Sequence, residues 1–150
     1  MRSRHVSRVI AASPAAVYDI ASDPDNLPLW AAGLASGDVA RKGDTLVVES
    51  PMGTVTVRFV PRNELGVLDH DVTLPSGVVV TNPMRVMPHP QGAEVVFTVR
   101  QLDLTDDELD RDVALVEADL EALRRLVEDR TRTTAAEPDR HEPGQGRPTA

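Results

Sequence analysis

The pattern of apolar residues divides this chain into a β-rich region followed by one long helix. Between residues 36 and 103, apolar and polar residues alternate, which is typical of strands that bury one face. Thr105 then begins an amphipathic helix that we expect to run to about Arg132. Because a one-faced sheet and such a helix are both unstable with their apolar sides in water, they must pack together. The chain is therefore predicted to have an α+β fold, with a space for a small molecule between sheet and helix.

Start signals predict three helices. Ser13–Pro14 combines an N-cap residue with proline at the first helical position, and Asp23–Pro24 repeats the combination. We therefore expect a first short helix after Ser13 and a second over residues 25–34, which carries Trp30. Residues 105–108, with the sequence TDDE, form a capping box that begins the long helix. The two short helices form a V-shaped connection after the first strand.

Short turns separate most of the expected strands, so neighbouring strands must be antiparallel. The expected strands cover residues 5–12, 39–42, 45–50, 54–62, 66–74, 78–87 and 93–102. With the long helix they form a single domain over residues 1–132. Residues 133–150 have no apolar periodicity and repeated Pro and Gly, which predicts a disordered C-terminal tail.

Composition argues against several classes of function. The net charge of −8 opposes nucleic-acid binding, which needs clustered positive charge. The longest apolar runs are far shorter than the roughly 18 residues of a membrane span, so we expect a cytoplasmic protein without a membrane span.

No cofactor is expected either. The chain has no cysteine, and its four histidines are too scattered to form a metal site. It also lacks a dinucleotide-binding or phosphate-binding glycine motif.

Pairing the strands across their turns predicts which side chains share the inner face of the sheet. The expected opposite pairs are His70 with Asn82, Leu68 with Met84, Val72 with Val80, Val48 with Val57, Leu46 with Phe59, Val86 with Val95, and Met84 with Phe97. On this face only His70 and Asn82 are strongly polar. Burying either without a partner would cost roughly 1–3 kcal/mol, so they should bond to each other, to water or to a ligand.

Two interpretations of this pair stay open: a satisfied core pair without function, and contacts to a ligand. A mostly apolar face with a few convergent polar groups is usual for a small-ligand site. On the second interpretation, the expected ligand-lining residues are His70, Asn82, Trp30, Val57, Phe59, Leu68, Val80, Met84 and Phe97. Trp30 either closes one end of the cavity or, as we favour, packs in the core.

The charged neighbours of the pair are expected outside. Asp69 and Asp71 flank His70, and successive strand residues point to opposite faces. The same alternation places Arg85 and Arg100 on the outer face, although a bulge at Pro83 could redirect Arg85.

Several segments together resemble the START-like, or Bet v 1-like, superfamily, and within it the SRPBCC proteins of polyketide cyclase/dehydrase type. These segments are VSRVIAASPAAVYDIASDPDNLPLW, GVLDHDVTLPSG, NPMRVMP, GAEVVFTV and TDDELDRD. The resemblance covers residues 3–130 and implies a helix-grip fold, in which a curved antiparallel sheet wraps around a long C-terminal helix. It carries no catalytic motif that can be transferred to this chain.

Three functions remain open from the sequence. The first is binding of a small hydrophobic ligand, such as a polyketide, a lipid or an aromatic compound, in the internal cavity. The second is a cyclase or dehydratase without metal or nucleotide cofactor, in which His70 is the general acid/base and Asn82 orients it or holds an oxyanion. The third is a protein-interaction module, which an exposed apolar patch would support. The sequence does not indicate the oligomeric state.

Overall fold

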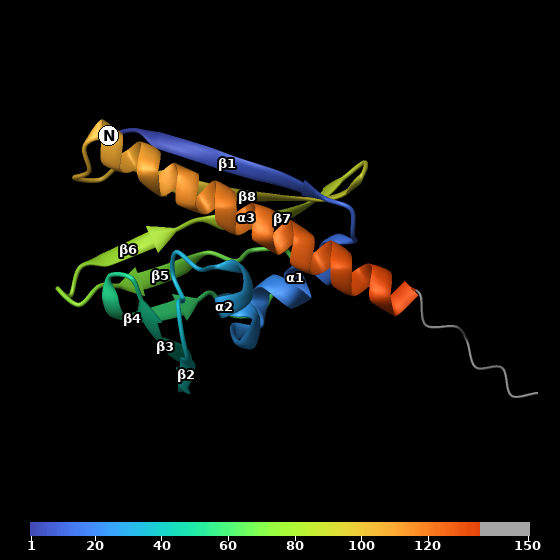
Figure 1. The fold of residues 1–150 in the computed structure, drawn as a ribbon, viewed down its shortest axis with the longest axis horizontal. Helices are drawn as coiled ribbons and strands as arrows, with labels where there is room; N and C mark the ends of the chain where they lie inside the picture. Colours follow the sequence, from blue (N-terminus) through green and yellow to red (C-terminus); the bar gives the residue numbers. More distant parts are fainter. Residues whose placement is uncertain (136–150) are drawn as a thin grey trace, which may run out of the picture.

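The computed structural model describes residues 1–135 and has the predicted α+β helix-grip architecture (Figure 1). Its elements are β1 (Ser3–Ile10), α1 (Pro14–Ser22), a 3-10 turn η1 (Pro24–Asn26), α2 (Leu27–Trp30), β2 (Val39–Lys42), β3 (Thr45–Ser50), β4 (Gly53–Phe59), β5 (His70–Thr73), β6 (Val79–Asn82), β7 (Met84–His89), β8 (Gly92–Arg100) and α3 (Asp106–Ala135). The helix α3 continues three residues past the predicted domain boundary. The rest of the predicted tail, residues 136–150, lies outside the described residues.

The predicted start signals of the first and last helices are confirmed. The hydroxyl of Ser13 accepts a hydrogen bond from the Ala16 backbone N–H at 3.2 Å, which caps α1. At the start of α3, the Thr105 backbone N–H donates to the Glu108 carboxylate at 2.8 Å. The Glu108 backbone N–H donates to the Thr105 hydroxyl at 3.2 Å. This reciprocal pair is the capping box that the sequence predicts.

The second short helix is much shorter than predicted. Instead of covering 25–34, α2 ends at Trp30, and Ala31 leaves the helical conformation with φ −102° and ψ 52°. A separate turn follows, closed by a hydrogen bond from the Leu34 N–H to the Ala31 carbonyl at 2.9 Å. The chain then returns toward the sheet through glycines that do not favour a helix.

The expected single sheet is divided into two, with every strand pair antiparallel. One sheet has the order β1-β8-β7 and the other β2-β3-β4-β5-β6. They are linked by a bridge between Val67 and Arg85 and by a hydrogen bond from the Leu68 N–H to the Met84 carbonyl at 2.9 Å. The predicted strand 78–87 is interrupted at Pro83, which lacks the N–H that a continuous ladder needs.

The predicted register is confirmed for two hairpins and wrong for the third. His70 faces Asn82 and Val72 faces Val80 across β5 and β6, and the predicted pairs of β7 and β8 also form. In the β3–β4 hairpin, Leu46 faces Val57 and Val48 faces Val55, a shift of two residues. The turn there contains only residues 51 and 52, because Ser50 already pairs with Gly53. A shift of two keeps each side chain on its predicted face.

The core lies between the sheets and one face of α3. The helix packs against β1 and β8, and α1 and α2 also contact it (Figure 1). Its buried residues recur at helical spacing: Leu109, Val113, Leu120, Leu123 and Val127. Each buried Leu or Val stabilises the fold by roughly 1.5–3 kcal/mol relative to exposure. None of the helices within residues 1–135 combines the length and apolar character needed to cross a membrane.

Candidate functional site

His70 is buried on the inner face of β5, between two phenylalanine rings. Only 5% of its surface is exposed. Its ring lies 4.7 Å from that of Phe59, centroid to centroid, and 5.8 Å from that of Phe97 in an edge-on arrangement. Nδ1 lies 2.9 Å from the carbonyl oxygen of Leu68. Because a carbonyl can only accept, Nδ1 carries the proton in the neutral ring and Nε2 carries a lone pair.

Burial lowers the pKa of His70 below its ordinary value. The Leu68 carbonyl and the charges of Asp69 and Asp71 oppose this shift but do not cancel it. The imidazole is therefore neutral at pH 7, and Nε2 is a hydrogen-bond acceptor or a base. The predicted inner position of His70 is confirmed, and its chemistry is that of an acceptor.

Asn82 occupies the position opposite His70, as predicted, and its side chain is half-buried. The side-chain hydrogen bonds of residues 1–135 include none between the two. His70 instead bonds to backbone two residues earlier on its own chain segment. The amide of Asn82 therefore remains available to another partner.

The other expected ligand-lining residues separate into two groups. Val57, Leu68, Met84 and Trp30 are buried in the core cluster. Phe59, Val80 and Phe97 are only half-buried, although strand alternation places them on the inner face. We name the half-buried group, with Asn82 and the central histidine, the His70 patch: Phe59, His70, Val80, Asn82 and Phe97.

Trp30 has the packing position that we favour. It is buried, and its Nε1 has no hydrogen-bond partner among the described residues. Such an unpaired donor costs roughly 1–3 kcal/mol.

The acidic residues beside His70 point away from it, as predicted. Asp69 accepts two hydrogen bonds from the Arg85 guanidinium, at 2.9 and 2.7 Å, and one from the Met84 backbone N–H at 2.9 Å. Arg85 holds the pKa of Asp69 below its usual value. Asp71 accepts a hydrogen bond from the hydroxyl of Thr81 on the neighbouring strand, at 2.5 Å. Neither carboxylate therefore lies beside His70 on the inner face of the sheet.

Sequence reasoning missed a half-buried carboxyl on α3, that of Asp119. Asp119 lies against the loop after α2, and its Oδ2 is 3.2 Å from the position that a Cβ on Gly33 would take. Partial burial raises its pKa to about 6, and the nearby backbone N–H groups of Ala32 and Gly33 oppose this rise. No local pattern indicated this position, because Asp119 lies in an acidic stretch that is typical of a solvated helix face.

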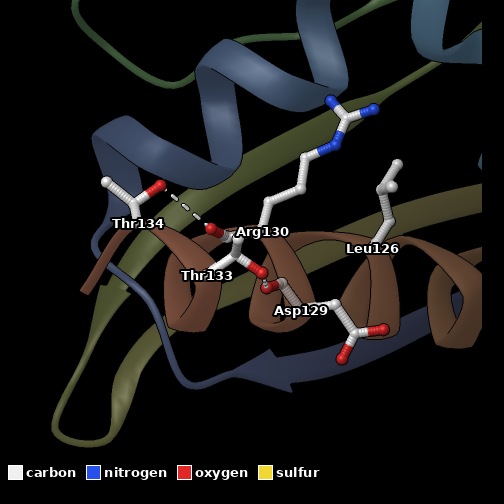
Figure 2. A pocket seen from close by; sticks show the side chains of 5 residues that line it. All are labelled: Leu126, Asp129, Arg130, Thr133 and Thr134. Carbon is white, nitrogen blue, oxygen red and sulfur yellow. Dashed lines mark hydrogen bonds between the residues drawn. The ribbon is translucent and has the colours of Figure 1, made fainter. Parts of the chain in front are cut away.

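Two hollows lie away from the predicted site. A groove of about 790 Å³ runs between the start of α1 and the loop after β4; its lining includes Tyr18, Asn63 and Leu65. The Asn63 backbone N–H donates to the Tyr18 hydroxyl at 3.0 Å, which ties loop to helix. A second hollow, of about 410 Å³, lies along the last turns of α3 (Figure 2). Its lining residues are Leu126, Asp129, Arg130, Thr133 and Thr134. No residue of the predicted site lines either hollow.

Solved structures share this fold at low sequence identity. The Aha1 dimer from Colwellia psychrerythraea has a TM-score of 0.70 and 16% identity, over 85% of this chain and 97% of that one. The protein XoxI from Bacillus cereus has a TM-score of 0.64 and 17% identity, over 87% and 99%. A protein of unknown function from Staphylococcus aureus has a TM-score of 0.63 and 14% identity, over 87% and 96%. At these identities the likeness concerns the fold alone.

No curated protein matches the chain in sequence. A family profile described as polyketide cyclase/dehydrase and lipid transport matches residues 1–135. This match spans the whole described region and confirms the resemblance that the sequence motifs indicate. The chain belongs to the polyketide cyclase/dehydrase and lipid transport family.

Proposed function

We propose that the protein binds a small, uncharged, hydrophobic molecule against the His70 patch, between the sheet and α3. The family description and the helix-grip fold support a hydrophobic ligand. The observation that carries the proposal is His70 itself: a buried neutral imidazole, set between two aromatic rings, whose Nε2 accepts no hydrogen bond from the described residues. An acceptor without a protein partner, beside two aromatic rings, suits a ligand that donates a hydrogen bond to it.

The patch suits an apolar molecule with one hydroxyl group. The rings of Phe59 and Phe97 offer apolar surface, and Nε2 of His70 offers an acceptor. The amide of Asn82 supplies both a donor and an acceptor on the facing strand. The patch contains no charged side chain, so an ionised ligand would lose its hydration without compensation.

We propose binding rather than turnover. Acid/base catalysis of cyclisation needs a second group that holds the developing oxyanion or orients the base, the role expected of Asn82. Asn82 faces His70, but the hydrogen bonds of residues 1–135 include none between the two side chains. Asp69 and Asp71, the titratable neighbours of His70 in sequence, make their hydrogen bonds on the outer face. His70 is the sole titratable member of the patch.

A matched pair of variants on β6 tests the location. Val80 is on the inner face and Val79 on the outer face of the same strand. We expect the wild-type chain to bind 1-naphthol, and Val80→Trp to weaken this binding about tenfold or more by filling the patch. Val79→Trp should leave the affinity close to that of the wild type. Equal effects of the two variants, or no binding by the wild type, would overturn the proposal.

A matched pair of ligands tests the role of the imidazole. His70→Leu keeps an apolar side chain of similar size but removes the acceptor. We expect this variant to bind 1-naphthol about tenfold more weakly, which corresponds to the loss of one hydrogen bond of roughly 1–1.5 kcal/mol. The affinity for 1-methylnaphthalene, which lacks the hydroxyl, should not fall. An equal loss for both ligands would show that His70 only packs.

A further inference from the structure

The loop between β4 and β5 holds a leucine side chain in water. Leu65 is 82% exposed, and among the large apolar residues that the structure describes only Met1 is more exposed. Leu65 stands at the rim of the groove of about 790 Å³ that lies between this loop and the start of α1. Single exposed apolar residues are common on protein surfaces, so the meaning of Leu65 depends on how the loop is built.

The loop is folded around the side chain of Asn63. Its amide oxygen accepts hydrogen bonds from the backbone N–H groups of Leu65, at 3.0 Å, and Val67, at 3.1 Å. Its NH₂ group donates to the carbonyls of Pro61, at 3.1 Å, and Val67, at 2.9 Å. One side chain thus fixes the backbone on both sides of Leu65.

The same loop is fastened to the two elements that flank it. The Asn63 backbone N–H donates to the Tyr18 hydroxyl of α1 at 3.0 Å, and the Arg62 guanidinium lies 5.1 Å from the centre of the Tyr18 ring. On the other side, the Val86 N–H of β7 donates to the Gly66 carbonyl at 2.8 Å. Because the loop is already ordered, a partner that binds Leu65 does not have to immobilise its backbone first.

We propose that this face is the interface of a homodimer, in which Leu65 of each copy packs into the groove of the other. The groove offers apolar surface from Pro14 and Ala15 of α1 and from Pro88 of β7. An exposed apolar anchor and a hollow that can receive it lie on one face, which is what a two-fold symmetric contact requires. The inference is independent of the proposed function, because no residue of the His70 patch lines the groove.

The exposed charges of the groove are also self-complementary. Arg62 is positive, whereas Asp19 and Glu64 are negative, and all three line the groove. Arg62 pairs with Asp19 of its own copy, while Glu64 makes no ion pair within residues 1–135. Two-fold symmetry sets the face of one copy against the same face of the other, so Glu64 meets a surface that carries Arg62.

The size of this face predicts a weak dimer. The groove is lined by twelve residues, whereas stable complexes use about 20–30 residues on each side. We therefore expect a dissociation constant in the micromolar range, with Leu65 as the residue that contributes most.

Sedimentation equilibrium of the full chain, between about 1 and 200 μM, tests the interface. Leu65→Ala removes the anchor, and Ala15→Trp fills the groove at an exposed position of α1. Each should raise the dissociation constant of the dimer about tenfold or more. Met52→Ala removes another apolar side chain, 56% exposed in the turn between β3 and β4, and should leave it unchanged. Equal unfolding midpoints of the variants and the wild type would show that the fold is intact.

Mixing the two variants tests the two-fold arrangement itself. Leu65→Ala keeps a free groove and Ala15→Trp keeps the leucine, so a mixed dimer retains one of the two contacts that each variant alone has lost. With a fluorophore on one variant, the mixture should associate more tightly than either variant by itself. A wild type that stays monomeric up to about 200 μM would overturn the proposal and leave the groove to another occupant. A dimer that neither variant weakens, or a mixture no tighter than its components, would overturn it as well.

Discussion

Nδ1 of His70 lies 2.9 Å from the carbonyl oxygen of Leu68, two residues earlier in the chain. This contact fixes the neutral tautomer and leaves the lone pair on Nε2. Leu68 lies in the segment that links the two sheets, since its N–H donates to the Met84 carbonyl, and His70 begins β5 two residues later. The chemistry of the patch is therefore set by the backbone that joins the sheets.

The buried imidazole should make the protein sensitive to acid. The pKa of His70 in the folded state lies below its ordinary value of 6.5, so the folded state binds fewer protons than the unfolded state. Stability should fall as the pH drops below about 6.5. In His70→Leu the free energy of unfolding should fall less between pH 7.5 and 5.5, as measured by urea unfolding. His5→Leu, at an exposed position on β1, is the control and should show the same fall as the wild type. If the free energy of unfolding fell equally with pH in His70→Leu and the wild type, His70 would not be the source of the acid sensitivity.

Asp119 should have the opposite pH dependence. Its pKa of about 6 lies above the ordinary 3.8, so the folded state binds more protons than the unfolded state between these values. Its contribution to stability should decrease as the pH rises from about 4 to 6. Asp119→Asn should therefore stabilise the protein at pH 7.5, by roughly 1 kcal/mol because partial exposure screens the charge, and have little effect at pH 4. Asp110→Asn, at an exposed position of α3, is the control. If Asp119→Asn changed the free energy of unfolding equally at pH 7.5 and pH 4, the raised pKa of Asp119 would be excluded.

Gly66 should be intolerant of a side chain. Its φ of +73° is rarely adopted by other residues, and an added Cβ would overlap the carbonyl oxygen of Val86. Gly66→Ala should reduce the free energy of unfolding by more than about 2 kcal/mol. Gly77 has a similar φ of +86° but no atom near an added Cβ, so Gly77→Ala should cost only about 1 kcal/mol. Equal losses in chemical denaturation would show that the contact with Val86 is unimportant.

The carboxylate of Asp69 should contribute more to stability than its ion-pair partner. It binds both Arg85 and the Met84 N–H, so Asp69→Ala leaves a backbone donor unpaired and should cost about 1–2 kcal/mol. Arg85→Ala should cost less, because the Met84 bond survives. Arg58→Ala, which removes an exposed pair with Asp44, is the control and should change little. A larger loss for Arg85→Ala than for Asp69→Ala would contradict the role of the backbone bond.

The sequence predicts the fold and most of the register because these depend on local patterns. The capping residues Ser13 and Thr105 and the three-residue turn before Val78 each act within a few positions of the chain. Alternation then decides the face of each side chain, so a register error of two residues in the β3–β4 hairpin left the inner face unchanged.

The features that the sequence did not predict depend on distant contacts. Asp119 is half-buried because a loop more than 80 positions earlier lies against it. The division of the sheet needs Asp69 to take the Met84 N–H, which no local pattern indicates. Nor did the pattern distinguish Phe59 and Phe97, which are half-buried, from Val57 and Met84, which are fully buried.

Nitrogen-15 NMR of the imidazole of His70, with and without 1-naphthol, tests the central claim most directly. The account predicts a neutral ring with its proton on Nδ1 at pH 6.5, and a change in the Nε2 shift that saturates as the ligand binds. An imidazolium at that pH, a proton on Nε2, or an Nε2 shift that does not respond to bound ligand would contradict it.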